Sequence, residues 1–132
     1  MFDSSFYNTF DQTKVEAIKE HSKHIGLEKI ETIKLSDLFE SLNLKSIDFL
    51  SVDVEGLDFE VLNSNNWDKY RPKVIVTEIF SEGFELLTTD KIYQLFKKNG
   101  YILFCNFPTN AFYLETTFFN ERLSKVNKYL TK

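Results

Sequence analysis

The chain has 132 residues, of which 42% are apolar, 16% aromatic and 27% charged, and this balance excludes a disordered tail or a fibre. Its net charge is −4, and lysines and arginines are scattered without a basic stripe, so nucleic acid is not an expected partner. The apolar stretches are far shorter than a membrane span, and residues 1–10 lack the basic start of a signal peptide. We therefore expect one globular domain over residues 1–132, located in the cytoplasm and without membrane partners.

Glycine is scarce in this composition. The chain has four glycines, Gly26, Gly56, Gly83 and Gly100, and no two of them share a loop. A phosphate-binding or dinucleotide-binding loop needs two or three glycines within about six to eight residues, so that the backbone can approach the ligand. The printed sequence therefore contains no loop of this kind.

The first third of the chain predicts lightly held elements. Thr13 followed by Glu16 is a capping-box pattern, which predicts a helix that ends at Gly26. Residues 30–35 alternate between apolar and polar side chains, as in an exposed or edge strand. Ser36 is then expected to open a short helix.

The centre of the chain predicts a strand, a helix and a second strand. Residues 47–54 form a dense apolar run, which is typical of a strand covered on both faces in a parallel sheet. A helix over 56–63 follows, and the β-branched run at 72–80 predicts the next strand.

The last third continues the alternation of helices and strands. We expect a helix over 89–99, a strand over 101–107 and, after a turn, a strand over 111–115 that pairs with it in the antiparallel direction. A helix over 120–130 closes the chain. The expected fold class is therefore α/β, with a mixed sheet.

Acidic residues stand where two of the predicted strands end. Asp53 and Glu55 close the first core strand with an i, i+2 spacing that points both side chains to one side if the strand continues through them, and Glu78 closes the second. Ligands of open α/β sheets bind beyond the carboxyl ends of the strands. Three carboxylates there could act as a general base, bind a hard cation or accept hydrogen bonds from ligand hydroxyls. Alternatively, each could cap the following helix.

The run IDFLSVDVEGLDFEVLNSNNWDKYRPKVIVTEIF resembles the central signature of the FkbM-type methyltransferase family. That signature has an apolar strand, Asp-x-Glu-Gly-x-acidic, a leucine four residues later, and an x-Pro-x strand that ends in glutamate. The matching residues are Asp53, Glu55, Gly56, Asp58, Leu62, Pro72 and Glu78. Leu35, Asp37 and the pair Gly100 and Tyr101 also stand where the family has them, so the resemblance covers residues 30–115.

The resemblance implies a methyltransferase that uses S-adenosylmethionine and has a Rossmann-like seven-stranded sheet. It implies methylation of a hydroxyl group on a sugar, glycan or small natural product. In that fold the chain would supply strands four to seven, with an antiparallel last strand. The cofactor-binding glycine loop after strand one would lie upstream of the printed residues, so the cofactor-binding residues stay unknown and we expect this chain alone to be inactive.

The resemblance also assigns roles to the three carboxylates. Asp53 is expected to face the acceptor hydroxyl, as a base or as an orienting group, while Glu55 and Glu78 orient the acceptor or support the edge of the sheet. A metal held by these carboxylates is an alternative, but without a fuller ligand set we assign none.

Two other functions stay open from the sequence. A truncated or split methyltransferase would act as an interaction module, because its strand at 47–54 would be an unpaired apolar edge that a second copy or a complementing N-terminal segment could cover. A receiver-like signalling domain would use Asp53 and Thr77 together with Phe107 and Pro108. That alternative lacks the acidic pair after a first apolar strand and the lysine that receiver phosphorylation requires.

Overall fold

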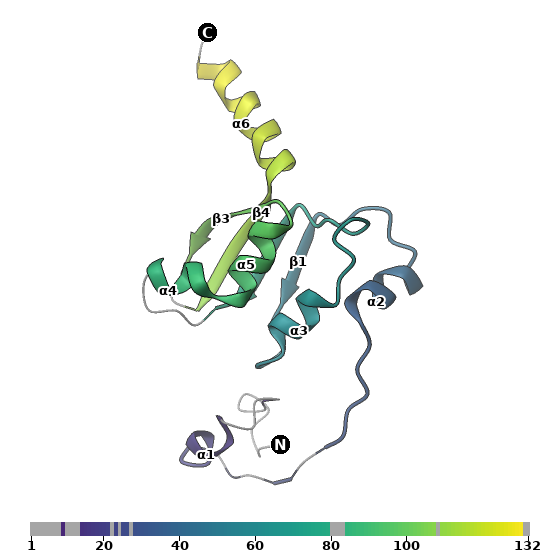
Figure 1. Ribbon diagram of the computed structural model, residues 1–132, viewed down its shortest axis with the longest axis vertical. Coiled ribbons are helices and arrows are strands. Elements are labelled where there is room, and N and C mark those ends of the chain that lie inside the picture. Colours follow the sequence, from purple (N-terminus) through teal and green to yellow (C-terminus); the bar gives the residue numbers. More distant parts are fainter. Residues whose placement is uncertain are drawn as a thin grey trace.

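A computed structural model of the chain describes residues 9, 14–21, 23, 25–26, 28–79, 84–107 and 109–130. These residues form a four-stranded mixed sheet with helices packed on it (Figure 1). In chain order the elements are α1 (Val15–Ile18), α2 (Leu35–Ser41), β1 (Phe49–Val52), α3 (Asp58–Asn63), β2 (Val74–Glu78), α4 (Phe84–Thr89), α5 (Lys91–Lys98), β3 (Tyr101–Asn106), β4 (Asn110–Glu115) and α6 (Thr116–Leu130). None of the described helices is long and apolar enough to cross a membrane.

The sheet has the strand order β1-β2-β4-β3. β1 and β2 are parallel, whereas β4 is antiparallel to both of its neighbours, β2 and β3. The antiparallel pairing of the last two strands is confirmed, and β4 lies between β2 and β3 instead of at the sheet edge. The α/β class with a mixed sheet is therefore confirmed, and its parallel pair with an antiparallel last strand fits the expected partial Rossmann-like sheet.

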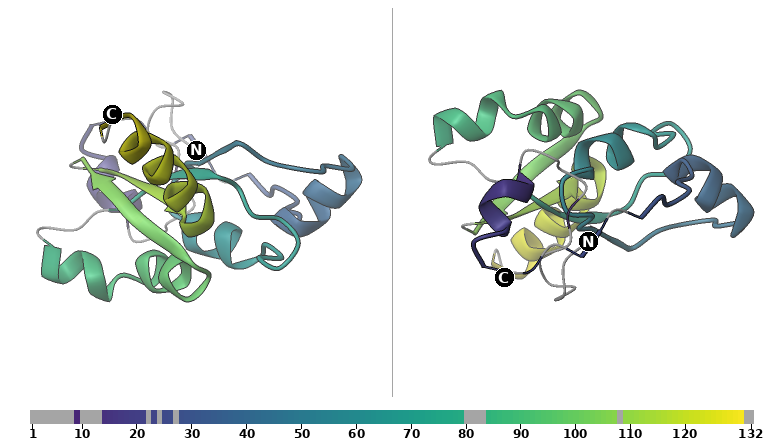
Figure 2. Two further views of the ribbon diagram at one scale, coloured as in Figure 1. Left: turned by 90° about the horizontal axis from the view of Figure 1, so that it is seen from above. Right: turned by 90° about the horizontal axis from the view of Figure 1, so that it is seen from below.

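Helices α3, α4 and α5 lie on one face of the sheet, and α6 leaves its end and projects away from the body (Figures 1 and 2). The core beneath α3 and α5 is rich in aromatic rings, which supply large buried areas. The Phe96 ring of α5 packs on Tyr113 of β4 with their centroids 4.4 Å apart, and on Trp67 with 5.5 Å. The buried cluster comprises Val52, Leu62, Trp67, Ile75, Ile79, Leu87, Ile92, Phe96, Tyr101, Ala111 and Tyr113.

Local sequence explains where α5 begins and ends. The Asp90 carboxylate accepts a hydrogen bond from the backbone N–H of Ile92 at 2.7 Å, which satisfies a donor that the first turn leaves unpaired. Gly100 follows the helix with a φ of +76°, a left-handed conformation that glycine adopts without strain. The predicted helix over 89–99 is confirmed, and α4 before it is an additional helix that the sequence did not indicate.

The strand predicted at residues 30–35 is wrong. This segment has no strand structure, and the side chains of Ile30 and Ile33 are 56% and 67% exposed. An alternating pattern forms a strand only beside a neighbouring strand, and among the described strands β1 pairs with β2 alone. Helix α2 instead begins at Leu35, whose backbone N–H donates to the Ser64 hydroxyl at 2.8 Å.

Three smaller predictions also need correction. The N-terminal helix is only the four residues of α1, and Thr13 of the predicted capping box lies outside the described residues. Ser36 does not cap α2, because the helix begins one residue earlier without a side-chain cap. β1 is not covered on both faces: Val52 is buried, but Phe49 is 58% exposed and Ser51 is exposed.

We expect the same substitution at a buried and at an exposed leucine to have clearly different effects on the free energy of unfolding. Leu62 of α3 is fully buried, so Leu62→Ala is expected to lower the free energy of unfolding by about 2–5 kcal/mol through lost burial and a residual cavity. The matched control is Leu42→Ala, where the side chain is 58% exposed and the expected change is below about 0.5 kcal/mol. Urea unfolding measures both values, and equal losses would contradict this placement of the core.

Candidate active site

Acidic side chains gather where β1 and β2 end, and we call Asp53, Glu55, Asp58 and Glu78 the acidic rim. Asp53 directly follows β1, and Glu78 is the last residue of β2. The strands are parallel and Val52 lies opposite Thr77, so Asp53 and Glu78 stand at the same edge of the sheet. The Asp53 side chain is exposed and that of Glu78 is half-buried.

The rim carboxylates are close enough to act on one another. Partial burial raises the pKa of Glu78 above its ordinary value, and the negative charges of Asp53, Glu55 and Asp58 raise it further. Lys14 opposes this shift. The structure therefore brings the three carboxylates singled out in the sequence to one place.

A tight turn carries Glu55 away from β1. Glu55 has a φ of +53°, and Gly56 after it has a φ of +109°. A left-handed conformation is uncommon for a residue with a side chain. The Glu55 carbonyl accepts a hydrogen bond from the Thr9 hydroxyl at 2.9 Å, and its exposed side chain does not cap α3, which has no side-chain cap. The capping alternative is thus wrong for Glu55.

Asp58 is the rim residue that the sequence reasoning left without a role. It is the first residue of α3 and only 7% exposed, and its carboxylate accepts from the Gly56 N–H at 3.4 Å and from the Thr77 hydroxyl at 3.5 Å. Burial raises the pKa of Asp58, backbone donors including the Gly56 N–H lower it, and the charge of Asp53 raises it. Asp58 therefore joins the turn to β2. The sequence feature that could have identified it is the third acidic position of the motif, after Asp53 and Glu55.

The rim can supply oxygen acceptors and proton acceptors. Within the described ranges, no group of three or more His, Cys, Asp or Glu side chains is arranged to hold a metal ion. Neighbouring carboxylates of this kind can accept a proton from a bound hydroxyl group or orient that group by hydrogen bonding.

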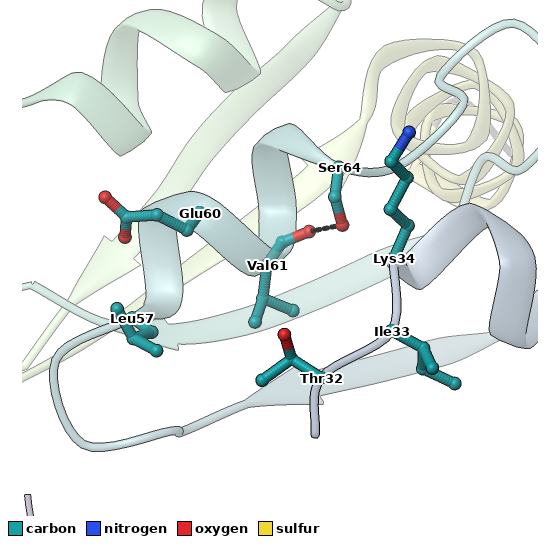
Figure 3. Close-up of a pocket in the computed structure, with 7 residues that line it drawn as sticks. All are labelled: Thr32, Ile33, Lys34, Leu57, Glu60, Val61 and Ser64. Atoms are coloured by element: carbon teal, nitrogen blue, oxygen red, sulfur yellow. Dashed lines mark hydrogen bonds between the residues drawn. The ribbon is translucent and has the colours of Figure 1, made fainter. Parts of the chain in front are cut away.

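A groove of about 360 Å³ lies beside α3, between this helix and the segment before α2 (Figure 3). Val61 of α3 points toward Thr32 of that segment, and Leu57 continues the lining toward the rim turn. The Ser64 hydroxyl donates to the Val61 carbonyl at 2.7 Å and accepts from the Leu35 N–H, so its only donor hydrogen is already used. The groove offers shape and apolar contact, whereas the acidic chemistry belongs to the rim. Its lining residues are Thr32, Ile33, Lys34, Leu57, Glu60, Val61 and Ser64.

The coupling between rim carboxylates can be measured. Asp53→Asn removes a negative charge that disfavours ionised Glu78, so the pKa of Glu78 is expected to fall toward its ordinary value. Carboxyl carbon NMR over a pH titration follows Glu78 directly. Asp68→Asn, at an exposed position outside the rim, is the matched control and should leave this pKa unchanged. If the pKa of Glu78 is the same in Asp53→Asn as in the unchanged chain, the two carboxylates are not close together and the acidic rim is not assembled.

Comparison with known families places these residues in context. The Methyltransferase FkbM domain matches residues 3–103, a span that contains the whole acidic rim. Comparisons with curated proteins and with solved structures each found no match. The matched span begins well before the resemblance noted from the motifs, ends within β3, and leaves β4 and α6 outside it. Because it covers more than half of the chain, the protein belongs to the FkbM methyltransferase domain family.

Proposed function

We propose that the chain forms the acceptor-binding side of an S-adenosylmethionine-dependent O-methyltransferase that acts on a hydroxyl of a sugar, glycan or small natural product. The observation that carries the proposal is the acidic rim, where exposed Asp53 stands beside half-buried Glu78 at the carboxyl ends of two parallel strands. Membership of the FkbM family supports methyl transfer as the reaction. The rim supports a hydroxyl as its acceptor.

Methyl transfer to a hydroxyl oxygen requires that the oxygen be oriented and lose its proton. Asp53 is the exposed carboxylate at the end of β1, so it accepts the hydroxyl hydrogen bond and serves as proton acceptor or orienting group. Glu78, whose pKa is raised by partial burial and by the neighbouring carboxylates, orients the acceptor or supports the edge of the sheet. Glu55, on the far side of the turn, orients the acceptor.

The bound cofactor supplies an electrophilic methyl group, and the described residues do not fit it by themselves. The glycines of the chain stand in separate segments, so its sequence offers no glycine-rich turn. Among described residues, the buried polar atoms without a hydrogen-bond partner are Asn65 Oδ1, Trp67 Nε1 and Tyr113 Oη, and none belongs to the rim. We therefore derive no step through the cofactor from this chain.

The lack of a glycine-rich turn in the sequence leads to a prediction about cofactor binding. Calorimetric titration of the chain with S-adenosylmethionine is expected to give no measurable binding heat, because no glycine-rich turn supplies backbone donors. S-adenosylhomocysteine, which lacks only the transferred methyl group, is the matched ligand control and should behave identically. Micromolar affinity for S-adenosylmethionine would contradict this prediction and show that the chain has its own cofactor site.

Acceptor binding tests the proposed function without requiring turnover. In amide NMR titrations with a panel of methyl glycosides, we expect shift changes at residues 53–58 and at Glu78. Asp53→Asn should weaken binding about tenfold or more, because a hydrogen bond to a charged group contributes about 1.5–3 kcal/mol. Asp68→Asn should leave the affinity unchanged. Shifts confined to the groove beside α3, or none for any glycoside, would contradict the proposal.

A non-catalytic interaction module is the second candidate, and the edge of β1 favours it. β1 pairs only with β2 among the described strands, and the Phe49 side chain on it is 58% exposed. An apolar edge strand of this kind offers backbone donors and acceptors to another chain. Glycoside binding that depends on Asp53 would favour the enzyme over this alternative.

A further inference from the structure

Helix α6 extends away from the body of the molecule (Figure 1), and several of its apolar side chains are exposed. Leu123 is 47% exposed, Val126 is 52% exposed and Tyr129 is 81% exposed. Contacts at its base include a hydrogen bond from the Phe118 N–H to Glu115 at 2.8 Å and the Phe119 ring, which lies 6.5 Å from that of Phe104. A 15-residue helix is marginally stable in water unless one face packs against a partner.

Three apolar side chains of α6, Phe119, Leu123 and Val126, form one stripe, which we call the α6 stripe. Their spacings of four and three residues place them on a single helix face, the pattern of a seam between two helices. Phe104 of β3 is 60% exposed and extends the stripe at its base through its contact with Phe119. The stripe lies outside the residues matched by the family, so the shared methyltransferase domain does not account for it.

We propose that the α6 stripe packs against the same stripe of a second copy of this chain, with the two helices antiparallel. In this arrangement Leu123 of each copy lies opposite Val126 of the other, so the seam is complementary to itself. The last turn of each helix then reaches the base of the other, beside Phe104 and Phe119. A parallel pair would instead bring both bodies to the same end of the seam, because α6 leaves the body at its first residues (Figure 1).

The side chains that flank the stripe favour a second copy as the occupant. The Arg122 guanidinium lies 5.1 Å from the centre of the Phe118 ring of its own helix, on the side of the stripe that also carries Tyr129. Antiparallel packing places Tyr129 of the other copy beside this cation for a second cation–π contact. Asn120 and Asn127 flank the other side, so no like charges meet there. The remaining charged side chains of the helix, Glu121, Lys125 and Lys128, lie on outer positions.

An anionic membrane is the weaker occupant for this helix. Membrane-surface helices carry lysine and arginine along the polar border, where the cations reach the headgroups. On α6 the only cation directly beside the stripe is Arg122, because Lys125 and Lys128 point away from it.

Helix α6 starts at the end of β4 that lies opposite Tyr101, whereas the rim lies at the other end of the strand, where Asn110 faces Glu78. Pairing through α6 therefore leaves the rim open.

Sedimentation velocity over a range of micromolar concentrations tests the proposal. The chain is expected to associate reversibly into a dimer, because a single helix pair makes a small interface. Leu123→Glu puts a charge in the seam and should raise the dissociation constant about tenfold or more. Lys128→Glu introduces the same side chain on the outer face and should leave dimerisation intact. Far-UV circular dichroism checks that each variant keeps its helix content.

Cross-linking tests the antiparallel register. In a Cys105→Ala background, a mixture of Arg122→Cys and Tyr129→Cys chains should form mixed disulfide dimers in preference to dimers of either variant alone. The proposal would be overturned if the chain stays monomeric, or if Leu123→Glu leaves the dissociation constant of the dimer unchanged. A dimer abolished by Phe49→Lys and kept by Leu123→Glu would also overturn it, because association would then run through the β1 edge. Binding to phosphatidylserine vesicles that depends on Leu123, without dimerisation, would assign the stripe to a membrane.

Discussion

The parallel register between β1 and β2 is the constraint on which the candidate site depends. With Val52 opposite Thr77, the residues after both strands lie side by side, and Asp53 meets Glu78. A slip of one residue would turn every side chain of β1 to the other face of the sheet and bury Asp53 in place of Val52. Asp58 supports this register, because its carboxylate contacts both the Gly56 N–H and the Thr77 hydroxyl. The turn, α3 and β2 are thereby joined through one buried acid.

The rim concentrates negative charge where a stable fold alone would avoid it. A folded-state pKa of Glu78 above its ordinary value means that the folded chain holds this proton more tightly than the unfolded chain does. Stability from this group is therefore full at low pH and is lost as the pH rises through the raised pKa. Glu55 adds a left-handed backbone conformation at the same place. Strain and like charges that gather at one strand edge are typical of functional sites, which supports the proposed role of the rim.

The sequence predicted the parts of the fold that local pattern determines. Dense apolar runs gave β1 and β2, and acidic residues at the ends of two neighbouring parallel strands had to lie together. The segment at 30–35 failed because alternation describes a strand only when another strand is available to pair with it. Coverage of β1 failed for a related reason, since the exposure of Phe49 depends on what lies above the sheet. The role of Asp58 depends on a contact with Thr77, which no local pattern specifies.

The β1 edge and the α6 stripe are both exposed, and pairing through one or the other would affect the acidic rim differently. The β1 edge ends next to Asp53, so a strand that paired there would bury part of the proposed acceptor site and change the burial and the neighbouring charges that raise the pKa of Glu78. Helix α6 starts at the opposite end of the sheet, because β4 runs antiparallel to β2 from Asn110 beside the rim to Glu115 away from it. Association through the α6 stripe thus holds two rims apart and leaves both exposed. A chain that must admit a bulky hydroxyl acceptor can pair through α6 and keep its site accessible, whereas pairing through β1 would couple assembly to the chemistry of the rim.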